Sequence, residues 1–220
     1  VVVSSFAGTG QYNPSSLNSK LTITKANTSI TVPNFTIQPG QTKYLTATLR
    51  RAGDNALISG EELTFRIFYN ILGTAITDGV GVASLSYTGN ETLSIGAHTL
   101  FVEFDGDTNY NVFLNTGTLT VKQAPTKITA SSVSGKAGTT VTLKAKVIRT
   151  TDKAALANRT LTFQIDGVTV GTATTDSTGV GTLSYSIPAG ATVGKHPINV
   201  SFSEETFYLA SSDGAANLTV

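Results

Sequence analysis

The sequence repeats itself at a spacing of 98 residues, and this period limits what the chain can fold into. Aromatic, histidine and glycine positions recur together: Phe65 as Phe163, Tyr87 as Tyr185, His98 as His196, Phe104 as Phe202 and Gly73 as Gly171. A partial third copy lies at the start, where Phe6, Tyr12 and Leu21 match Phe104, Tyr110 and Leu119. A long fixed period is typical of an array of similar modules, and about 98 residues are enough for an independent core.

Alternation of apolar and polar residues predicts strands throughout. Leu63, Phe65 and Ile67 alternate with polar residues, as do Leu161, Phe163 and Ile165 one period later. Turn signals such as Pro39-Gly40 and Asp166-Gly167 separate short runs of this kind. About seven short strands in each repeat predict tandem immunoglobulin-like antiparallel β-sandwiches. The chain has no Cys and no Trp, so we expect Phe104 and Phe202 to help fill the cores.

Two motifs carry a resemblance to a known family. Residues 176–185 (DSTGVGTLSY) and 194–202 (GKHPINVSF) resemble the bacterial Ig-like repeats of large cell-surface proteins and adhesins. Residues 81–87 and 96–104 show the same pattern, and the Leu-Thr-Val runs at 119–121 and 218–220 look like the last strand of such repeats. The resemblance implies stalk, spacer or binding modules rather than catalysts.

The repeats also predict the domain boundaries. Residues 1–25 correspond to the final two strands of a partial repeat, read as 1–6 and 17–24. Residues 26–123 form repeat 1 and residues 124–220 form repeat 2. The connection at 122–125 is short and contains Pro125, which favours a semi-rigid rod over freely moving modules.

Composition excludes several classes of function. The net charge is +1 and charged residues make up 13 % of the chain, so no basic patch for nucleic acid is expected. No apolar run is long enough to insert in a membrane, and a chain without Cys has no thiolate metal site. Low charge and abundant Thr predict an extracellular or cell-surface protein.

Residues with chemical potential are expected to be structural. His98 and His196 occupy equivalent positions in separate modules, too far apart to share a site. Asp105, Asp107 and Asn109 resemble the start of a calcium loop, but the equivalent residues 7–11 hold no carboxylate and the Gly-x5-Glu ending of an EF-hand is missing. Lys144 and Lys146 alternate with apolar residues and should face water rather than form a buried cross-link. We therefore predict no catalytic residue, no metal and no cofactor.

Positions at which the repeats differ are the candidates for a contact surface. Phe68-Tyr69 stands where repeat 2 has the turn Asp166-Gly167. The same comparison sets Tyr44 against Thr142 and Phe113 against Ser211. Either these aromatics repack locally, or they contact another module or subunit. Six Asn-x-Ser/Thr sequons are candidate glycosylation acceptors: Asn27, Asn34, Asn90, Asn158, Asn199 and Asn217.

These observations lead to a non-enzymatic extracellular structural or adhesive protein, as part of a surface stalk, surface layer or filament. The alternative is a secreted module that binds carbohydrate or protein. The expected partners of the chain are neighbouring Ig-like modules or identical subunits. The apolar face of residues 1–25 must be covered, either by the rest of its own repeat or by strand complementation with a neighbouring subunit.

Overall fold

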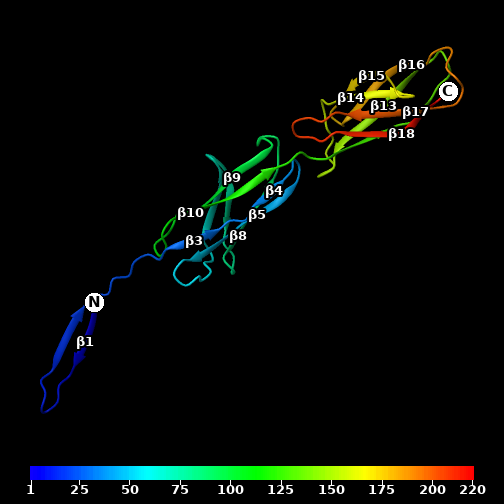
Figure 1. The fold of residues 1–220 in the computed structure, drawn as a ribbon. Helices are drawn as coiled ribbons and strands as arrows, with labels where there is room; N and C mark the ends of the chain where they lie inside the picture. Colours follow the sequence, from blue (N-terminus) through cyan, green and yellow to red (C-terminus); the bar gives the residue numbers. More distant parts are fainter.

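The computed structural model describes all 220 residues and contains strands β1 to β18 but no helix. Figure 1 shows three bodies in a line: a thin hairpin at the N-terminus, a middle sandwich and a C-terminal sandwich. The structure has no helix of sufficient length and apolarity to span a membrane.

Repeat 1 and repeat 2 each contain eight strands. Those of repeat 1 are β3 (Thr28–Thr31), β4 (Phe35–Ile37), β5 (Thr42–Arg51), β6 (Glu62–Ile67), β7 (Asn70–Ile76), β8 (Val82–Thr88), β9 (Gly96–Phe104) and β10 (Phe113–Val121). Those of repeat 2 are β11 (Thr126–Ala130), β12 (Val133–Ser134), β13 (Thr140–Arg149), β14 (Thr160–Ile165), β15 (Val168–Thr174), β16 (Val180–Ser186), β17 (Lys195–Phe202) and β18 (Ser211–Thr219).

The strand order of both repeats is that of an immunoglobulin-like sandwich. A three-stranded sheet, β3-β5-β8 or β11-β13-β16, faces a five-stranded sheet, β4-β10-β9-β6-β7 or β12-β18-β17-β14-β15. The strand count exceeds the expected seven because the first strand is split between the two sheets. Its second half, β4 or β12, pairs in parallel with the last strand of the repeat. The predicted all-β tandem sandwich fold is therefore confirmed.

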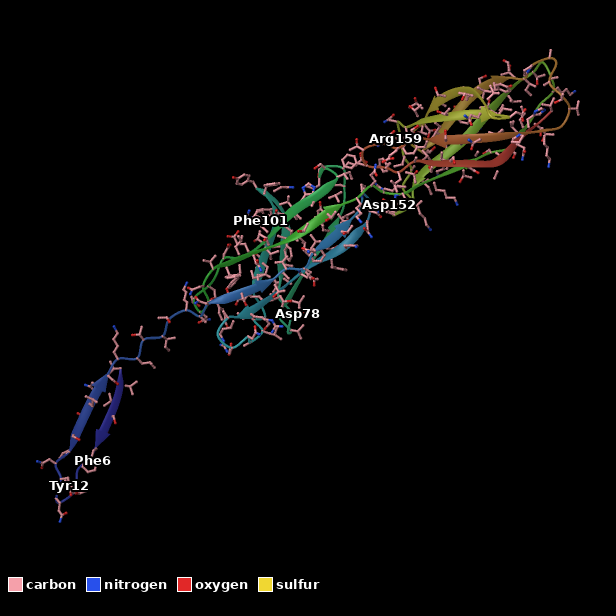
Figure 2. The ribbon with its side chains drawn as sticks, in the orientation of Figure 1. Phe6, Tyr12, Asp78, Phe101, Asp152 and Arg159 are labelled. Carbon is pink, nitrogen blue, oxygen red and sulfur yellow. The ribbon has the colours of Figure 1, made fainter.

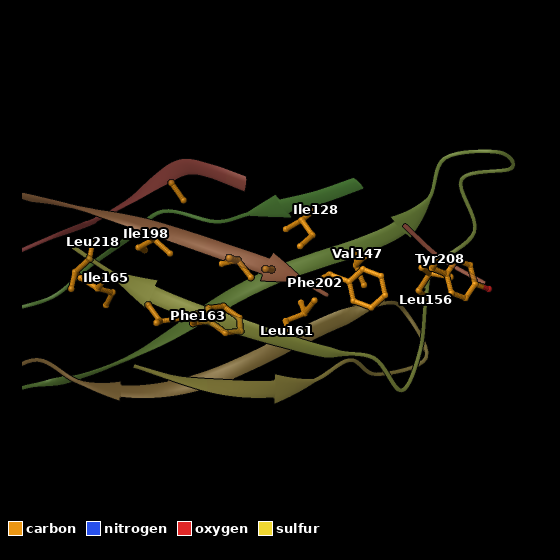
Figure 3. Close-up of a cluster of buried hydrophobic side chains, with 14 of the residues drawn as sticks. Ile128, Val147, Leu156, Leu161, Phe163, Ile165, Ile198, Phe202, Tyr208 and Leu218 are labelled. Carbon is orange, nitrogen blue, oxygen red and sulfur yellow. The ribbon is translucent and has the colours of Figure 1, made fainter. Parts of the chain in front are cut away.

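Each repeat has its own core between its two sheets. The core of repeat 1 contains 15 buried residues and that of repeat 2 contains 16. Phe65 and Phe163 are fully buried, and Phe104 and Phe202 lie beside them in the same clusters, as the sequence predicted. Figure 3 shows the core of repeat 2. Burying a side chain such as Phe163 contributes about 1.5–3 kcal/mol to folding.

The N-terminal hairpin consists of β1 (Val2–Phe6) and β2 (Ser15–Ser19). Val2 pairs with Ser19 and Phe6 with Ser15, the same register, one period earlier, as β9 and β10. β2 ends at Ser19 and not at the expected Thr24, because in this register Ser19 already pairs with Val2, the first residue of β1. Tyr12 is 67 % exposed, whereas Tyr208, which matches it two periods later, is buried. Figure 2 shows Tyr12 with Phe6 at the turn end of the hairpin, far from both sandwiches.

Candidate functional site: the joint between the repeats and the surface of repeat 1

The joint between the two sandwiches is short and closely packed. Ala124, in the middle of the connection, is fully buried and pairs with the loop before Leu209 in repeat 2. The side-chain amide of Gln38 donates to the carbonyl of Gln123 at 2.9 Å. The amide of Gln123 donates in turn to the carbonyl of Glu205 at 2.9 Å. The connection is thus held to the sandwich on either side.

A polar cluster crosses the joint beside this connection. The hydroxyl of Tyr208, in repeat 2, donates a hydrogen bond to the carboxylate of Glu91 in repeat 1. The guanidinium of Arg159 lies 2.7 Å from Glu205 on one side and 3.7 Å from Glu91 on the other. It also lies over the ring of Tyr208, 5.0 Å from the centroid. Arg159 therefore links an acid of its own repeat to an acid of repeat 1.

Burial sets the chemistry of this cluster. Tyr208 is 1 % exposed, and burial raises its pKa, to which the hydrogen bond to Glu91 adds. The phenol thus stays protonated and able to donate at neutral pH. The Nε atom of Arg159 is buried without a hydrogen-bond partner. Its members bind one another through hydrogen bonds and ion pairs, and two of these contacts cross the joint, an arrangement suited to holding two modules together.

A second contact adjoins the first, since the guanidinium of Arg149 donates to the hydroxyl of Tyr208 at 3.4 Å. The backbone of Gly40 in repeat 1 packs directly against the ion pair of Arg149 and Asp152, whose nitrogen and oxygen are 2.7 Å apart. The hydrogen bond from Arg149 holds the pKa of Asp152 below its usual range. The hydroxyl of Thr151 donates to the carbonyl of Pro39 at 2.8 Å. The joint therefore has two points of attachment besides the covalent connection.

Comparison with the far end of repeat 1 shows which residues are particular to the joint. The pair Arg51–Asp54 repeats Arg149–Asp152 one period earlier, with a nitrogen–oxygen distance of 2.5 Å, so this pair braces its own loop in either repeat. Arg159, by contrast, has the acid Glu61 as its counterpart. The sequence prediction missed the joint, although this change of charge between the repeats was a readable signal.

The end of repeat 1 that lies at the joint is partly covered by repeat 2, whereas the equivalent end of repeat 2 is exposed. Ile95 lies in a hollow at the joint together with Leu209 and is 37 % exposed. Val193, its counterpart in repeat 2, is 91 % exposed. Nearby, a hollow of about 430 Å³ is lined by Tyr185, Ala191 and His196, among others. Leu93 takes the place of Ala191 in repeat 1 and packs against the core there.

The four residues proposed as a contact surface lie in different places. Tyr69 is fully exposed and Phe68 is 64 % exposed, at the two-residue turn between β6 and β7. Tyr44 is 68 % exposed on β5, which belongs to the other sheet. Phe113 is half-buried and packs against the core of repeat 1. The structure thus brings Phe68 and Tyr69 together and leaves Tyr44 and Phe113 apart from them.

The histidines and acidic turn residues make local contacts. The Nε2 atom of His98 lies 2.8 Å from the carbonyl of Ser94, and that of His196 lies 2.9 Å from the carbonyl of Thr192. Asp107 accepts the backbone N–H of both Asn109 and Tyr110, which closes a turn. No group of three or more His, Cys, Asp or Glu side chains is close enough to hold a metal ion.

Lys144 and Lys146 are exposed on β13, facing water. Four sequon asparagines are exposed, namely Asn27, Asn34, Asn90 and Asn158, whereas Asn199 and Asn217 are half-buried within strands. Asn199 also donates to Gln164 at 3.2 Å. The sequons therefore differ in how readily a glycan would fit.

No family model matches the chain, and no curated protein matches it. Among solved structures, it is similar to the Yersinia pseudotuberculosis adhesin InvE, with 20 % identity and a TM-score of 0.42 over 89 % of this chain and 61 % of that one. A tetra-tandem repeat from the extending region of a large adhesion protein is 18 % identical, with a TM-score of 0.41 over 88 % of this chain and 49 % of that one.

The titin domains Z1Z2 in complex with telethonin are 15 % identical, with a TM-score of 0.44 over 90 % of this chain and 98 % of that one. The chain thus spans less than two thirds of both adhesin structures. Two of these three structures are adhesion proteins, the class that the motifs at residues 176–185 and 194–202 also resemble. The assignment of an Ig-like sandwich rests on the strand order given above, and these low identities say nothing about a ligand.

Proposed function

We propose that the chain is a stretch of a non-enzymatic extracellular rod, in which stiff joints hold Ig-like modules in line as a stalk, surface layer or filament. The joint carries this proposal. Tyr208, Arg159 and Glu91 join the two repeats beside a connection of only four residues. A rod of this kind holds a binding module at a distance from the cell, and this role needs no catalytic site.

The energies favour a joint that is stiff but can bend under load. Glu91 and Arg159 have side chains 43 % and 26 % exposed, so water screens their attraction and the ion pair contributes at most about 1 kcal/mol. The hydrogen bonds from Tyr208 and Thr151 each add about 0.5–1.5 kcal/mol. Together these contacts restrict the angle between the modules without making it rigid.

Distances between spin labels on the two repeats would test the proposal. The chain has no Cys, so labels placed at Ser84→Cys and Thr182→Cys, exposed equivalent positions on β8 and β16, report only on the two repeats. We expect a narrow distance distribution that Arg159→Ala broadens. Glu61→Ala, at the counterpart position remote from the joint, serves as the matched control and should change nothing. A broad distribution before any substitution would contradict a stiff rod.

A further inference from the structure

The outer face of the five-stranded sheet differs sharply between the two repeats. In repeat 1, cross-strand pairing places Ile71, Arg66 and Phe101 in one row over β7, β6 and β9, and Glu103 beside Leu114 in the next. We call these five residues the lateral face. The same positions of repeat 2 hold only uncharged polar residues: Thr169, Gln164, Asn199, Ser201 and Ser212.

Arg66 organises the lateral face. Its guanidinium lies 4.7 Å from the centroid of the Phe101 ring and 3.4 Å from the carboxylate of Glu103. It also donates to the carbonyl of Phe68 at 2.8 Å, which ties the turn to the face. Because Glu103 balances the charge of Arg66, the lateral face has no net charge. The surface that flanks the β7 edge therefore offers no like-charge repulsion to a second copy.

The turn at the end of this face has an unfavourable backbone. Phe68 has a φ of 49°, a region in which a bulky side chain is uncommon. Repeat 2 places Asp166 at a φ of 52° in the same position, followed by Gly167, a pair well suited to such a turn. Such strain costs about 1–3 kcal/mol and tends to persist where a site needs it. In repeat 1 it places Phe68 and Tyr69 in solvent.

The free edge of the sheet adds a second feature. β7 is the outermost strand, so one side of its backbone has no partner within the chain. It carries no charged residue and no Pro, two of the usual protections of an exposed edge, although a bulge interrupts its pairing with β6 between Ile71 and Gly73. Ile71 and Ile76 are 63 % and 64 % exposed along it. An identical edge, turned through a two-fold axis, offers the complementary hydrogen-bonding groups and apolar side chains.

We propose that the β7 edge of repeat 1, with Ile71, Ile76 and the adjoining Phe68–Tyr69 turn, pairs side by side and antiparallel with the same edge of a second copy of this chain. The surface lies on the flank of the module and the tandem joint at its end, so both contacts can form together (Figure 2). Repeat 2, with its polar face, takes no part. Lateral pairing goes beyond the rod proposed above, because it would join two rods side by side.

Sedimentation velocity of the 220-residue chain, over a range of concentrations, tests this pairing. We expect a monomer–dimer equilibrium that Ile71→Lys weakens by about tenfold or more, since a charge on an edge strand opposes pairing. Thr169→Lys, the matched change on the edge of repeat 2, should leave it unaltered. The double variant Phe68→Asp/Tyr69→Gly, which installs the turn of repeat 2, should also weaken the dimer while keeping the melting temperature equal or higher.

Three outcomes would overturn the pairing. The chain could stay monomeric at high concentration, or the dimer could survive both repeat 1 variants, or Thr169→Lys could weaken it equally. A form lacking residues 1–25, in which both sandwich cores are intact, must still dimerise, since loss of the dimer there would assign association to the hairpin. Arg159→Ala must also leave the dimer unchanged, which separates this inference from the stiff joint.

Discussion

The hydroxyl of Tyr208 in repeat 2 donates to the carboxylate of Glu91 in repeat 1, across 117 residues of sequence. Tyr208 has Tyr110 as its counterpart in repeat 1, whereas Glu91 has Ala189 as its counterpart in repeat 2. The contact thus combines a tyrosine that both repeats have with a glutamate that only repeat 1 has. The result is a contact that only this joint can make.

The close approach at Gly40 leads to the first prediction. A Cβ atom there would lie 2.4 Å from Nε of Arg149 and 2.6 Å from the carboxylate of Asp152. Gly40→Ala should therefore displace the ion pair and broaden the distances between labels on the two repeats. Gly138→Ala is the control, because Gly138 has a φ of 78° against 75° for Gly40 but open space around it.

Both substitutions carry the same backbone strain, of about 1 kcal/mol or more. Each should lower the melting temperature of its own repeat by a similar amount, and only Gly40→Ala should loosen the joint. Equal loosening by the two variants would show that steric contact at Gly40 does not hold the modules together.

The strands and cores could be predicted from sequence because their signal is local. Alternation around Phe65 and Phe163 decides which side of a strand is buried, and the two copies support each other. The joint could not be predicted in this way. Arg159 and Glu91 are far apart in the sequence, each occurs in one repeat only, and their meeting depends on the angle between two modules. The lateral face likewise needed the strand register that brings Arg66 beside Phe101.

The hollow at the end of repeat 2 leads to a second prediction. Leu93 packs against the core of repeat 1, while its counterpart Ala191 lines a hollow of about 430 Å³. Ala191→Leu should bury added methyl groups there and stabilise repeat 2 by about 1 kcal/mol. Leu93→Ala should destabilise repeat 1 by about 2 kcal/mol, less than for a fully buried leucine. Urea unfolding followed for each repeat would measure both changes, and a loss of stability in Ala191→Leu would mean that the hollow cannot accept a larger side chain.

The acidic turn of repeat 1 leads to a third prediction, on metal dependence. Asp107 already uses its carboxylate to accept two backbone N–H groups, at 2.7 and 2.6 Å. Asp107→Ala should cost about 1 kcal/mol through loss of this turn closure. Melting curves of the unsubstituted chain with calcium and with a chelator should coincide. A rise of several degrees on adding calcium would instead show that Asp105 and Asp107 bind the ion.

The last prediction concerns the pH dependence of repeat 2. The carbonyl of Thr192 and the carboxylate of Asp166, 2.9 and 2.6 Å from the ring nitrogens of His196, raise the pKa of His196 above its ordinary value of 6.5. A group with a higher pKa in the folded chain stabilises it fully below the unfolded-state pKa, and this contribution is lost as pH rises through the folded-state pKa. We therefore expect the stability advantage of the unsubstituted chain over His196→Gln to be larger near pH 5.5 than near pH 8.5.

Urea midpoints of the repeat 2 transition, in buffers of equal ionic strength, would measure this difference. The pKa values of Asp176 and Asp213 are lowered, so their own contributions change mainly below this range and are common to both proteins. Asp166→Asn separates the two causes, because it removes the carboxylate and leaves the contact with Thr192. It should reduce the pH dependence without abolishing it. An advantage that stays constant from pH 5.5 to 8.5 would mean that His196 supports its loop only as a neutral ring.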